Sequence, residues 1–171
     1  SGLIWMVFLF ISVLGLHRSF SLEKEFDAIG LILSAPVDRS LIFLSKWVSG
    51  FLFLLIAQII IVPLFWLFLD LDIPEQIGLW LLIFIMTDLG IAAIGSLVAG
   101  ITLRARMSEV LLPILLFPLV SPLLIAAVKS TDAILMGLPF EEWKIWAAII
   151  FTFVIAFSVT GVLIFEYVSE E

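Results

Sequence analysis

Long hydrophobic runs separated by short polar segments dominate this chain. Five runs are present, and they cover residues 3–16, 47–69, 78–103, 110–128 and 145–165. A helix needs about 20 consecutive apolar residues to cross a hydrocarbon core about 30 Å thick. Runs of this length are typical of helices rather than of barrel strands, which need about 10 residues. The pattern therefore predicts an all-α integral membrane protein with five transmembrane helices in a single domain, residues 1–171.

The first hydrophobic run is shorter than the other four. As a helix, residues 3–16 would cover only about 21 Å, and the sequence begins with Ser1 rather than Met. Neither a basic segment nor a small-residue cleavage site is present, so the run does not resemble a secretory signal peptide. We expect that the first helix has lost its first turns and that the chain is a fragment.

Composition supports the membrane assignment and excludes several classes of function. Hydrophobic residues make up 64% of the chain and charged residues 13%, whereas a soluble domain has about 45–50% apolar residues. The net charge of −7 argues against nucleic acid as a partner. With no cysteine and one histidine, neither thiolate chemistry nor a His-rich metal site is available.

Motifs of nucleotide-binding and catalytic sites are absent from the sequence. A phosphate-binding P-loop needs a Gly-Lys pair, and the chain has none. We therefore expect no catalytic residue, no metal site and no cofactor bound directly, and ATP, if it is used, would bind to another subunit. His17, at the end of the first run, is either a polar helix end or a haem or metal ligand.

Basic residues in the connections predict the orientation in the membrane. Six of the eight Lys and Arg residues lie in residues 17–46 and 104–109, and the other two are in residues 129–144. The positive-inside rule places the first two of these segments in the cytoplasm. Five tryptophans near the predicted outer ends agree, because indole rings favour the headgroup level. We therefore expect a cytoplasmic C-terminus.

An acidic residue lies within the third predicted span. Asp88 is near the middle of residues 78–103, where an ionised carboxylate costs about 2.5–3.5 kcal/mol on insertion scales. It should face protein or a water-filled cavity, with Thr87 and Gln58 as candidate partners. A structural hydrogen bond, a contact on a substrate path and a proton relay all remain open as roles for Asp88.

Small residues and prolines predict how two of the spans pack. Five small residues lie at helical spacing in the third span: Ala92, Gly95, Ser96, Ala99 and Gly100. They should let a neighbouring helix approach closely. The fourth span contains Pro113, Pro118 and Pro122, each of which removes a backbone donor, so we expect a kink or break there. The kinked helix either moves during transport or is bent only to fit.

Two connections contain further helix signals. In residues 17–46, an apolar stretch begins with charged residues, and Glu23 suits a helix N-terminus. Pro36 would end this helix, and Asp38 can cap a second helix that starts at Arg39. We therefore predict two helices that meet at a proline elbow, with or without a protein partner. Residues 129–144 form either a short interfacial helix or an ordinary loop.

The same charged segment carries a family resemblance. Residues 23–46 read E-K-E-x-x-A-I-x-L-x-L-x-A-P-V-D-R-S-x-I-F-x-x-K. This order closely resembles the cytoplasmic segment of the haem exporter protein B family, CcmB. Four later segments resemble the family as well: G-I-A-A-I-G-S-L from Gly90, E-V-L-L-P-I-L-L-F-P-L from Glu109, L-L-I-A-A-V from Leu123 and F-E-Y-V-S-E-E from Phe165. The resemblance covers essentially the whole chain.

The resemblance implies an ABC-2-like permease bundle of six spans, of which this chain would hold the last five. It implies that residues 17–46 are a cytoplasmic coupling segment, in which the helix over residues 23–36 docks on an ABC ATPase. The implied coupling residues are Glu25, Phe26, Ile29, Leu33, Pro36, Asp38, Arg39 and Lys46. Further implied partners are a companion haem-handling membrane subunit, a periplasmic haem chaperone and membrane lipid.

By this resemblance, the chain would be a permease subunit for haem export or delivery in c-type cytochrome maturation, in a bacterial or archaeal cytoplasmic membrane. ATP hydrolysis on the partner would drive movement of haem or release of the haem-loaded chaperone. Three alternatives stay open: an ABC-2-type permease for another lipophilic substrate, a proton-coupled secondary transporter that uses Asp88, and a scaffold for haem-handling subunits. Asp88 departs from the family pattern, so the resemblance assigns it no role.

Overall fold

The chain folds into long α-helices. The computed structural model describes residues 1–25, 30–31, 34–70, 72–102 and 107–167. The long helices are α1 (Gly2–Glu25), α3 (Arg39–Leu69), α4 (Ile77–Thr102), α5 (Ser108–Leu135) and α6 (Phe140–Tyr167). No strand occurs among the residues that the structure describes. The predicted all-α fold is therefore confirmed.

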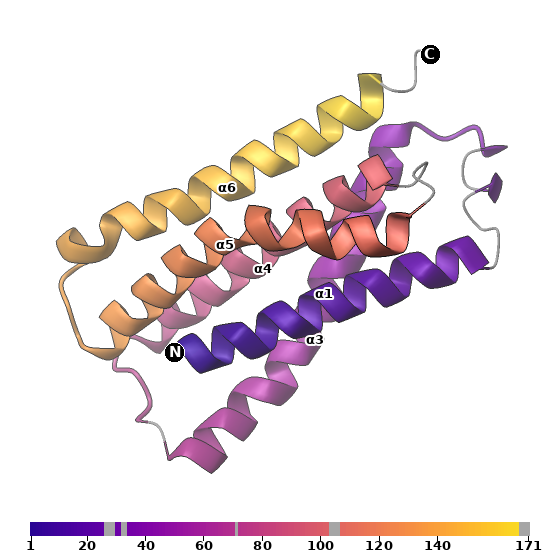
Figure 1. The fold of residues 1–171 in the computed structure, drawn as a ribbon. Helices are drawn as coiled ribbons and strands as arrows, with labels where there is room; N and C mark the ends of the chain where they lie inside the picture. Colours follow the sequence, from indigo (N-terminus) through magenta and orange to yellow (C-terminus); the bar gives the residue numbers. More distant parts are fainter. Residues whose placement is uncertain (26–29, 32–33, 71, 103–106, 168–171) are drawn as a thin grey trace.

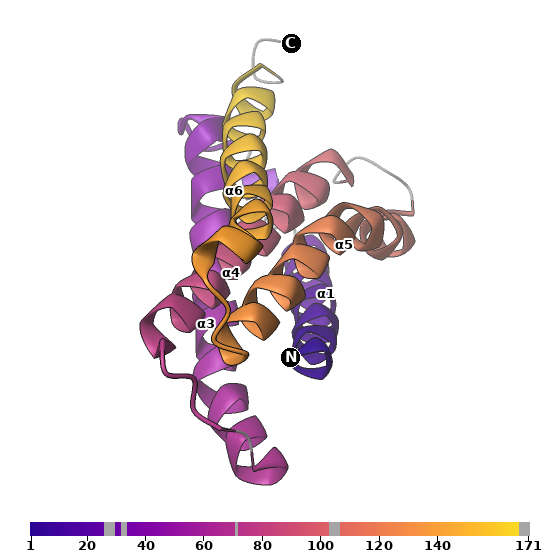
Figure 2. The same ribbon diagram turned by 90° about the vertical axis from the view of Figure 1, so that its left-hand side faces the viewer.

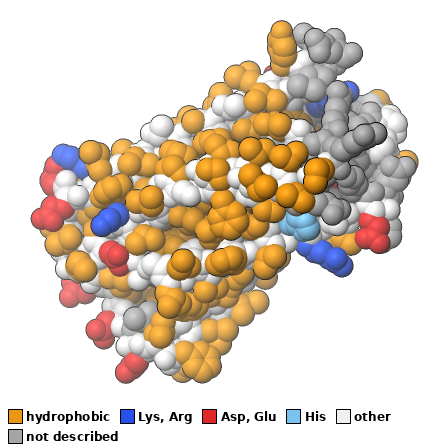
Figure 3. All heavy atoms as spheres, viewed as in Figure 1, with side chains coloured by type: hydrophobic (Ala, Val, Ile, Leu, Met, Phe, Trp, Pro, Cys, Tyr) orange, Lys and Arg blue, Asp and Glu red, His pale blue; other side chains and the backbone are white. Residues whose placement is uncertain are grey.

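Each of the five helices can cross a membrane by length and composition. Their candidate spans contain 22 to 31 residues, against the requirement of about 20. Figure 3 shows hydrophobic side chains over the middle of the visible face, with acidic and basic side chains toward its two ends. This distribution is that of a multi-pass membrane protein, because charged side chains are costly in the hydrocarbon core.

Helix α4 lies at the centre of the bundle. It contacts each of the other four helices, which Figures 1 and 2 show arranged around it. Phe84, Ile91 and Ile94 of α4 are fully buried, so the core of the molecule follows this helix. At one end of the bundle α1 ends and α3 begins, and α6 also ends there (Figure 1). We call it the linker end, because residues 26–38 join α1 to α3 there.

The first two helices differ from the predicted spans. Helix α1 continues past residue 16 to Glu25, since neither Pro nor Gly interrupts residues 16–25. Glu23 therefore lies near the C-terminus of α1, and the prediction that it begins a separate helix is wrong. Helix α3 starts at Arg39, as expected for the helix after the proline elbow, and runs without interruption through the predicted second span.

Helix α5 also extends beyond its predicted span. It continues from residue 128 to Leu135, so residues 129–135 form neither a separate interfacial helix nor a loop. Packing against α1 explains the extension, because Trp5 Nε1 donates a hydrogen bond of 3.1 Å to Thr131 Oγ1 and both side chains are buried. Pro113, Pro118 and Pro122 lie inside α5. Figure 2 shows the helix changing direction along its length, and we retain the prolines as the predicted cause.

Small residues of α4 accept side chains from neighbouring helices. A Cβ atom built on Gly95 would lie 2.3 Å from Leu16 Cδ1 of α1, so Leu16 occupies the space of the missing side chain. Close approach of two helices occurs at Gly50 of α3, whose Cβ position is 3.6 Å from the Ala92 Cβ. Gly95 thus accommodates a side chain from α1, whereas Ala92 meets the backbone of α3.

Tryptophans at the end opposite the linker end pack inside the bundle. Trp5, Trp80 and Trp143 are 1%, 2% and 3% exposed. The rings of Trp5 and Phe84 stack with centroids 4.3 Å apart, and the Trp66 and Trp80 rings lie 5.6 Å apart. These indole rings therefore stabilise the core in addition to marking one end of the bundle.

Candidate functional site

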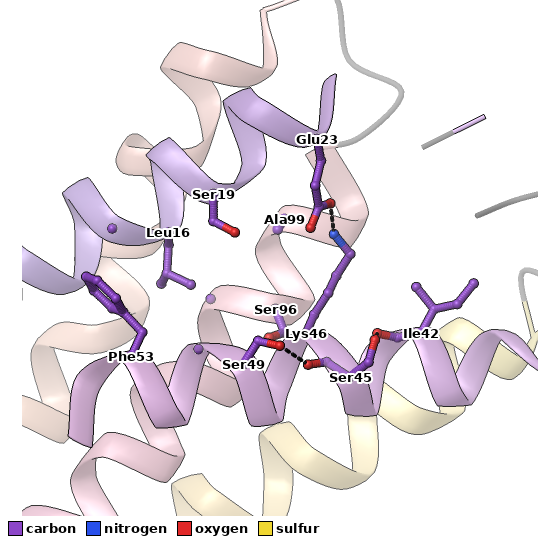
Figure 4. Close-up of a pocket in the computed structure, with 13 residues that line it drawn as sticks. Leu16, Ser19, Glu23, Ile42, Ser45, Lys46, Ser49, Phe53, Ser96 and Ala99 are labelled. Atoms are coloured by element: carbon purple, nitrogen blue, oxygen red, sulfur yellow. Dashed lines mark hydrogen bonds and ion pairs between the residues drawn. The ribbon is translucent and has the colours of Figure 1, made fainter. Parts of the chain in front are cut away.

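A cavity lies between α1, α3 and α4 near the linker end (Figure 4). Its volume is about 340 Å³, within the range of about 300–1,000 Å³ that is usual for small-molecule sites. Four serines, an ion pair and several glycines line it, together with the apolar side chains of Leu16, Ile42 and Phe53. The lining is therefore part polar and part apolar, which suits an amphipathic molecule.

Lys46 and Glu23 form an ion pair on the wall of this cavity (Figure 4). Their side chains are 16% and 27% exposed, respectively, so the pair is mostly shielded from solvent. Glu23 lies near the end of α1 and Lys46 near the start of α3. The ion pair therefore holds together the two helices that residues 26–38 connect. Removing one partner would leave a partly buried charge without its counter-ion, which is destabilising.

The serines of the cavity differ in their hydrogen bonds. Ser45 donates to the Ile42 carbonyl at 2.8 Å, and Ser49 donates to the Ser45 carbonyl at 2.7 Å. Ser96 of α4 is 2% exposed, and its hydroxyl has no hydrogen-bond partner among the described residues. A buried polar group without a partner costs about 1–3 kcal/mol. Ser96 is therefore a group that a bound molecule would satisfy.

Two phenylalanine rings pack onto glycines at the linker end. A Cβ atom on Gly161 of α6 would lie 2.1 Å from Phe43 Cζ, and one on Gly100 of α4 would lie 2.2 Å from Phe165 Cζ. The two rings also contact each other, with centroids 5.4 Å apart. We call Phe43, Gly100, Gly161 and Phe165 the aromatic seam. It joins the start of α3 to the ends of α4 and α6.

The predicted coupling residues are only partly brought together. Glu25, Pro36 and Asp38 are exposed, and Arg39 is half-buried as the first residue of α3. Lys46 points instead into the cavity, where it pairs with Glu23. Three further predicted positions lie outside the described residues: Phe26, Ile29 and Leu33.

The cap of α3 differs in detail from the prediction. Asp38 occupies the N-cap position, but its carboxylate makes no capping hydrogen bond. Instead its backbone carbonyl accepts a hydrogen bond of 3.0 Å from the Leu41 N–H. Just before it, the Val37 N–H donates to the Ala35 carbonyl at 2.8 Å, which makes a tight turn around Pro36. The chain therefore turns at Pro36, as predicted, but the carboxylate of Asp38 does not cap α3. Residues 26–29 and 32–33 of the helix predicted before this turn lie outside the described residues.

The intramembrane polar residues are buried without the predicted hydrogen bonds. Asp88 and Thr87 of α4 are fully buried, and Gln58 of α3 is 5% exposed. Thr87 donates to the Ile83 carbonyl at 2.7 Å. Neither oxygen of Asp88, nor either polar atom of the Gln58 amide, has a partner among the described residues. Thr87 and Gln58, the candidate partners, therefore do not bond to Asp88: the Thr87 hydroxyl already bonds to its own helix backbone, and the Gln58 amide has no partner among the described residues.

Comparison with known proteins identifies the family. Residues 1–167 match the family described as CcmB protein. The chain belongs to the CcmB family. No solved structure matches this CcmB chain.

Two curated relatives of this CcmB chain carry the name heme exporter protein B. The one from Pseudomonas aeruginosa is 29% identical over 147 residues, which cover 86% of this chain and 66% of the relative. The one from Rhodobacter capsulatus is 28% identical over 145 residues, covering 82% of this chain and 64% of the relative. The match thus spans about two thirds of the length of these relatives.

Sequence reasoning missed the cavity of this CcmB chain. Its residues come from three helices that are far apart in sequence, so no local sequence motif predicts it. One signal was available, since Gly15, Gly50 and Gly95 lie where α1, α3 and α4 meet, but the side chains of Phe53 and Leu16 fill the space at Gly15 and Gly95. The pairing of Glu23 with Lys46 could also not be read from the sequence, because it depends on α1 continuing through residue 25.

Proposed function

We propose that this chain is the membrane permease subunit of an ABC transporter complex that exports or delivers haem for c-type cytochrome maturation. A separate ATPase subunit would bind and hydrolyse ATP, so the chain itself would have no catalytic site. The observation that carries the proposal is the match to CcmB over residues 1–167. Two relatives named heme exporter protein B support haem as the substrate, and the membrane-length helices support the role of a permease.

The ATPase would dock on residues 17–46 at the linker end. The exposed side chains of Pro36 and Asp38 lie between α1 and α3 in the chain, where a partner could reach them. The ion pair Glu23–Lys46 links α1 to α3, and the aromatic seam links α3 to α4 and α6. Displacement of the elbow would therefore move several helices together. Coupling of this kind needs such an element with two arrangements, which ATP binding and hydrolysis would select.

This proposal fixes the orientation and the remaining partners. The linker end and the C-terminus would face the cytoplasm, in agreement with the distribution of Lys and Arg. The membrane would be the cytoplasmic membrane of a bacterium or archaeon. A companion haem-handling subunit and a periplasmic haem chaperone would receive haem, and ATP hydrolysis would drive either haem movement or release of the loaded chaperone.

A second candidate function rests on Asp88. Ionisable residues inside a membrane are expensive and commonly mark ion or proton paths, and both oxygens of Asp88 are buried without a partner among the described residues. A proton-coupled transporter that uses Asp88 would work without an ATPase and would lose activity in Asp88→Asn. Dependence on the ATPase therefore separates this candidate from the first.

Haem-peroxidase staining of c-type cytochromes tests the proposed function. The full-length protein and its cognate ATPase would be expressed in a bacterial host that lacks its own CcmB protein. We expect restored staining, which should disappear with a hydrolysis-dead ATPase. A permease for another lipophilic substrate would give no staining despite confirmed membrane insertion and assembly. A scaffold would give full staining with the dead ATPase.

A further inference from the structure

We propose that the cavity between α1, α3 and α4 binds an amphipathic anion. Its acidic head group would lie between Lys46 and Ser96, and its apolar part would lie along Leu16 and Phe53. Figure 4 shows these side chains around one cavity near the linker end. The coupling interpretation of residues 17–46 does not require this site, and the site does not follow from it.

The polar groups of the cavity favour an acidic ligand. Lys46 supplies a positive charge that is mostly shielded from solvent. The hydroxyl of Ser96 is a buried donor that lacks an acceptor among the described residues, whereas Ser45 and Ser49 already donate to backbone carbonyls. A carboxylate or phosphate group would accept hydrogen bonds from Lys46 and Ser96, and bonds to a charged group are about twice as strong as neutral ones. Glu23 neutralises Lys46 in the ligand-free state. The acidic group of the ligand would therefore compete with Glu23 for Lys46.

The apolar groups favour a ligand with a hydrophobic body. Leu16 and Phe53 form the side of the cavity away from the ion pair (Figure 4), and both side chains pack onto glycines, Leu16 onto Gly95 and Phe53 onto Gly15. Phe53 is 45% exposed, so this side reaches the surface of the bundle. A molecule could therefore enter laterally from the membrane and keep its head group near the bundle end, at the level of lipid head groups.

Occupancy of the site would affect the connection between α1 and α3. A ligand that pairs with Lys46 weakens the Glu23–Lys46 ion pair, which holds these two helices together. If residues 17–46 dock the ATPase, as the proposed function states, ligand binding would change how the docking segment is held. This regulatory consequence rests on the proposed function, whereas binding itself does not.

Two sources share this chemistry and can be tested in parallel. Haem carries two carboxylates on a large apolar ring, and an anionic phospholipid carries a phosphate on acyl chains. The full-length protein would be placed in nanodiscs without any ATPase. In one arm, haemin is titrated into phosphatidylcholine nanodiscs and tryptophan quenching is followed. In the other, native mass spectrometry counts the phosphatidylglycerol retained from nanodiscs that contain equal amounts of both lipids.

Variants of the cavity and a matched control decide the result. Ser96→Leu fills the cavity, and Lys46→Met combined with Glu23→Gln removes the charge without leaving Glu23 unpaired. Ser121→Leu is the control, because Ser121 is exposed on α5, outside the cavity, and its hydroxyl bonds to its own helix backbone. We expect both cavity variants to lower binding about tenfold or more, as loss of a hydrogen bond to a charged group predicts. Ser121→Leu should bind like the unmodified protein.

Cysteine labelling covers the case in which a cavity variant does not fold. The 171 residues contain no cysteine. Ser49→Cys therefore introduces one thiol among them, on the cavity wall, and Ser121→Cys is the control. Haemin or phosphatidylglycerol should slow maleimide labelling at Ser49→Cys but not at Ser121→Cys. If the cavity variants lose binding of only haemin or only phosphatidylglycerol, that ligand is the occupant. Unchanged binding in both cavity variants, or absence of protection in both arms, overturns the proposal.

Discussion

Asp88 is the residue whose surroundings are most at odds with its chemistry. It lies fully buried in the central helix α4, and neither of its oxygens has a partner among the described residues. Gln58, also buried and unpaired there, lies on the neighbouring α3. Burial of an unpaired carboxyl costs stability, so its retention needs either a functional reason or tolerance of the cost. The proposed permease function gives Asp88 no role, so it requires only that the protein tolerates this cost in stability.

We predict that Asp88→Asn preserves function and stabilises the protein. Asparagine keeps the shape but cannot ionise, so the cost of burying a charge at this position is removed. A gain of about 1 kcal/mol would raise the melting temperature of the purified full-length protein by about 2–4 °C. Asp70→Asn is the matched control, because Asp70 is exposed with φ 47°, a conformation that Asn tolerates. Loss of cytochrome staining in Asp88→Asn alone, with unchanged melting, would instead assign Asp88 to proton transfer.

Some residue positions followed from the sequence and others did not. Hydrophobic runs sufficed to place Asp88 inside a membrane helix, and the proline rule located the elbow at Pro36. The expected hydrogen bond between Thr87 and Asp88 is absent for a physical reason. The hydroxyl of a buried threonine in a helix bonds to the carbonyl four residues earlier. Glu23 was assigned to the wrong helix end because its partner Lys46 is a tertiary contact.

Among the helices, α3 and α6 meet at a sterically tight contact at the linker end. The ring of Phe43 is fully buried, stacks near Trp47 with centroids 6.2 Å apart, and occupies the space that a Cβ on Gly161 would need. Because neighbouring rings surround Phe43, the ring has little room to turn away. The start of α3 is therefore held rigidly against α6.

We predict that Gly161→Ala destabilises the protein by about 1–3 kcal/mol, which is the usual range for overpacking a core. It should also reduce cytochrome staining, because the start of α3 would be displaced. Gly78→Ala is the control: a Cβ at Gly78 of α4 meets nothing within 4 Å, so this change should not destabilise the helix. Thermal unfolding of the full-length protein measures both. Equal melting temperatures for the two variants would show that the seam is not tightly packed.

Helix existence was predictable, but helix ends were less so. Hydropathy identified all five helices, since each span must be apolar over its whole length. It underestimated α1 and α5, because residues 17–25 and 129–135 are polar enough to read as loops. These residues stay helical through contacts that hydropathy does not include, such as Glu23 with Lys46 and Trp5 with Thr131.

At the scale of the whole molecule, the linker end brings several contacts between helices together. Helix α4 provides the common core, while the ion pair and the aromatic seam connect α1, α3, α4 and α6 at this end. The cavity lies beside the same contacts. A partner that docks on the elbow at Pro36 would therefore act on four helices, which is the central claim of the account.

Reversal of charge at the elbow tests that claim most directly. Asp38→Lys with Arg39→Glu would be introduced into the full-length protein, and the cognate ATPase that co-purifies would be quantified. We predict a loss of about tenfold, because like charges would then face each other across the interface, while membrane insertion stays intact. The control is Asp72→Lys with Lys144→Glu, which reverses two exposed charges at the opposite end. Undiminished co-purification of the elbow variant, at the level of this control, would contradict docking at residues 17–46.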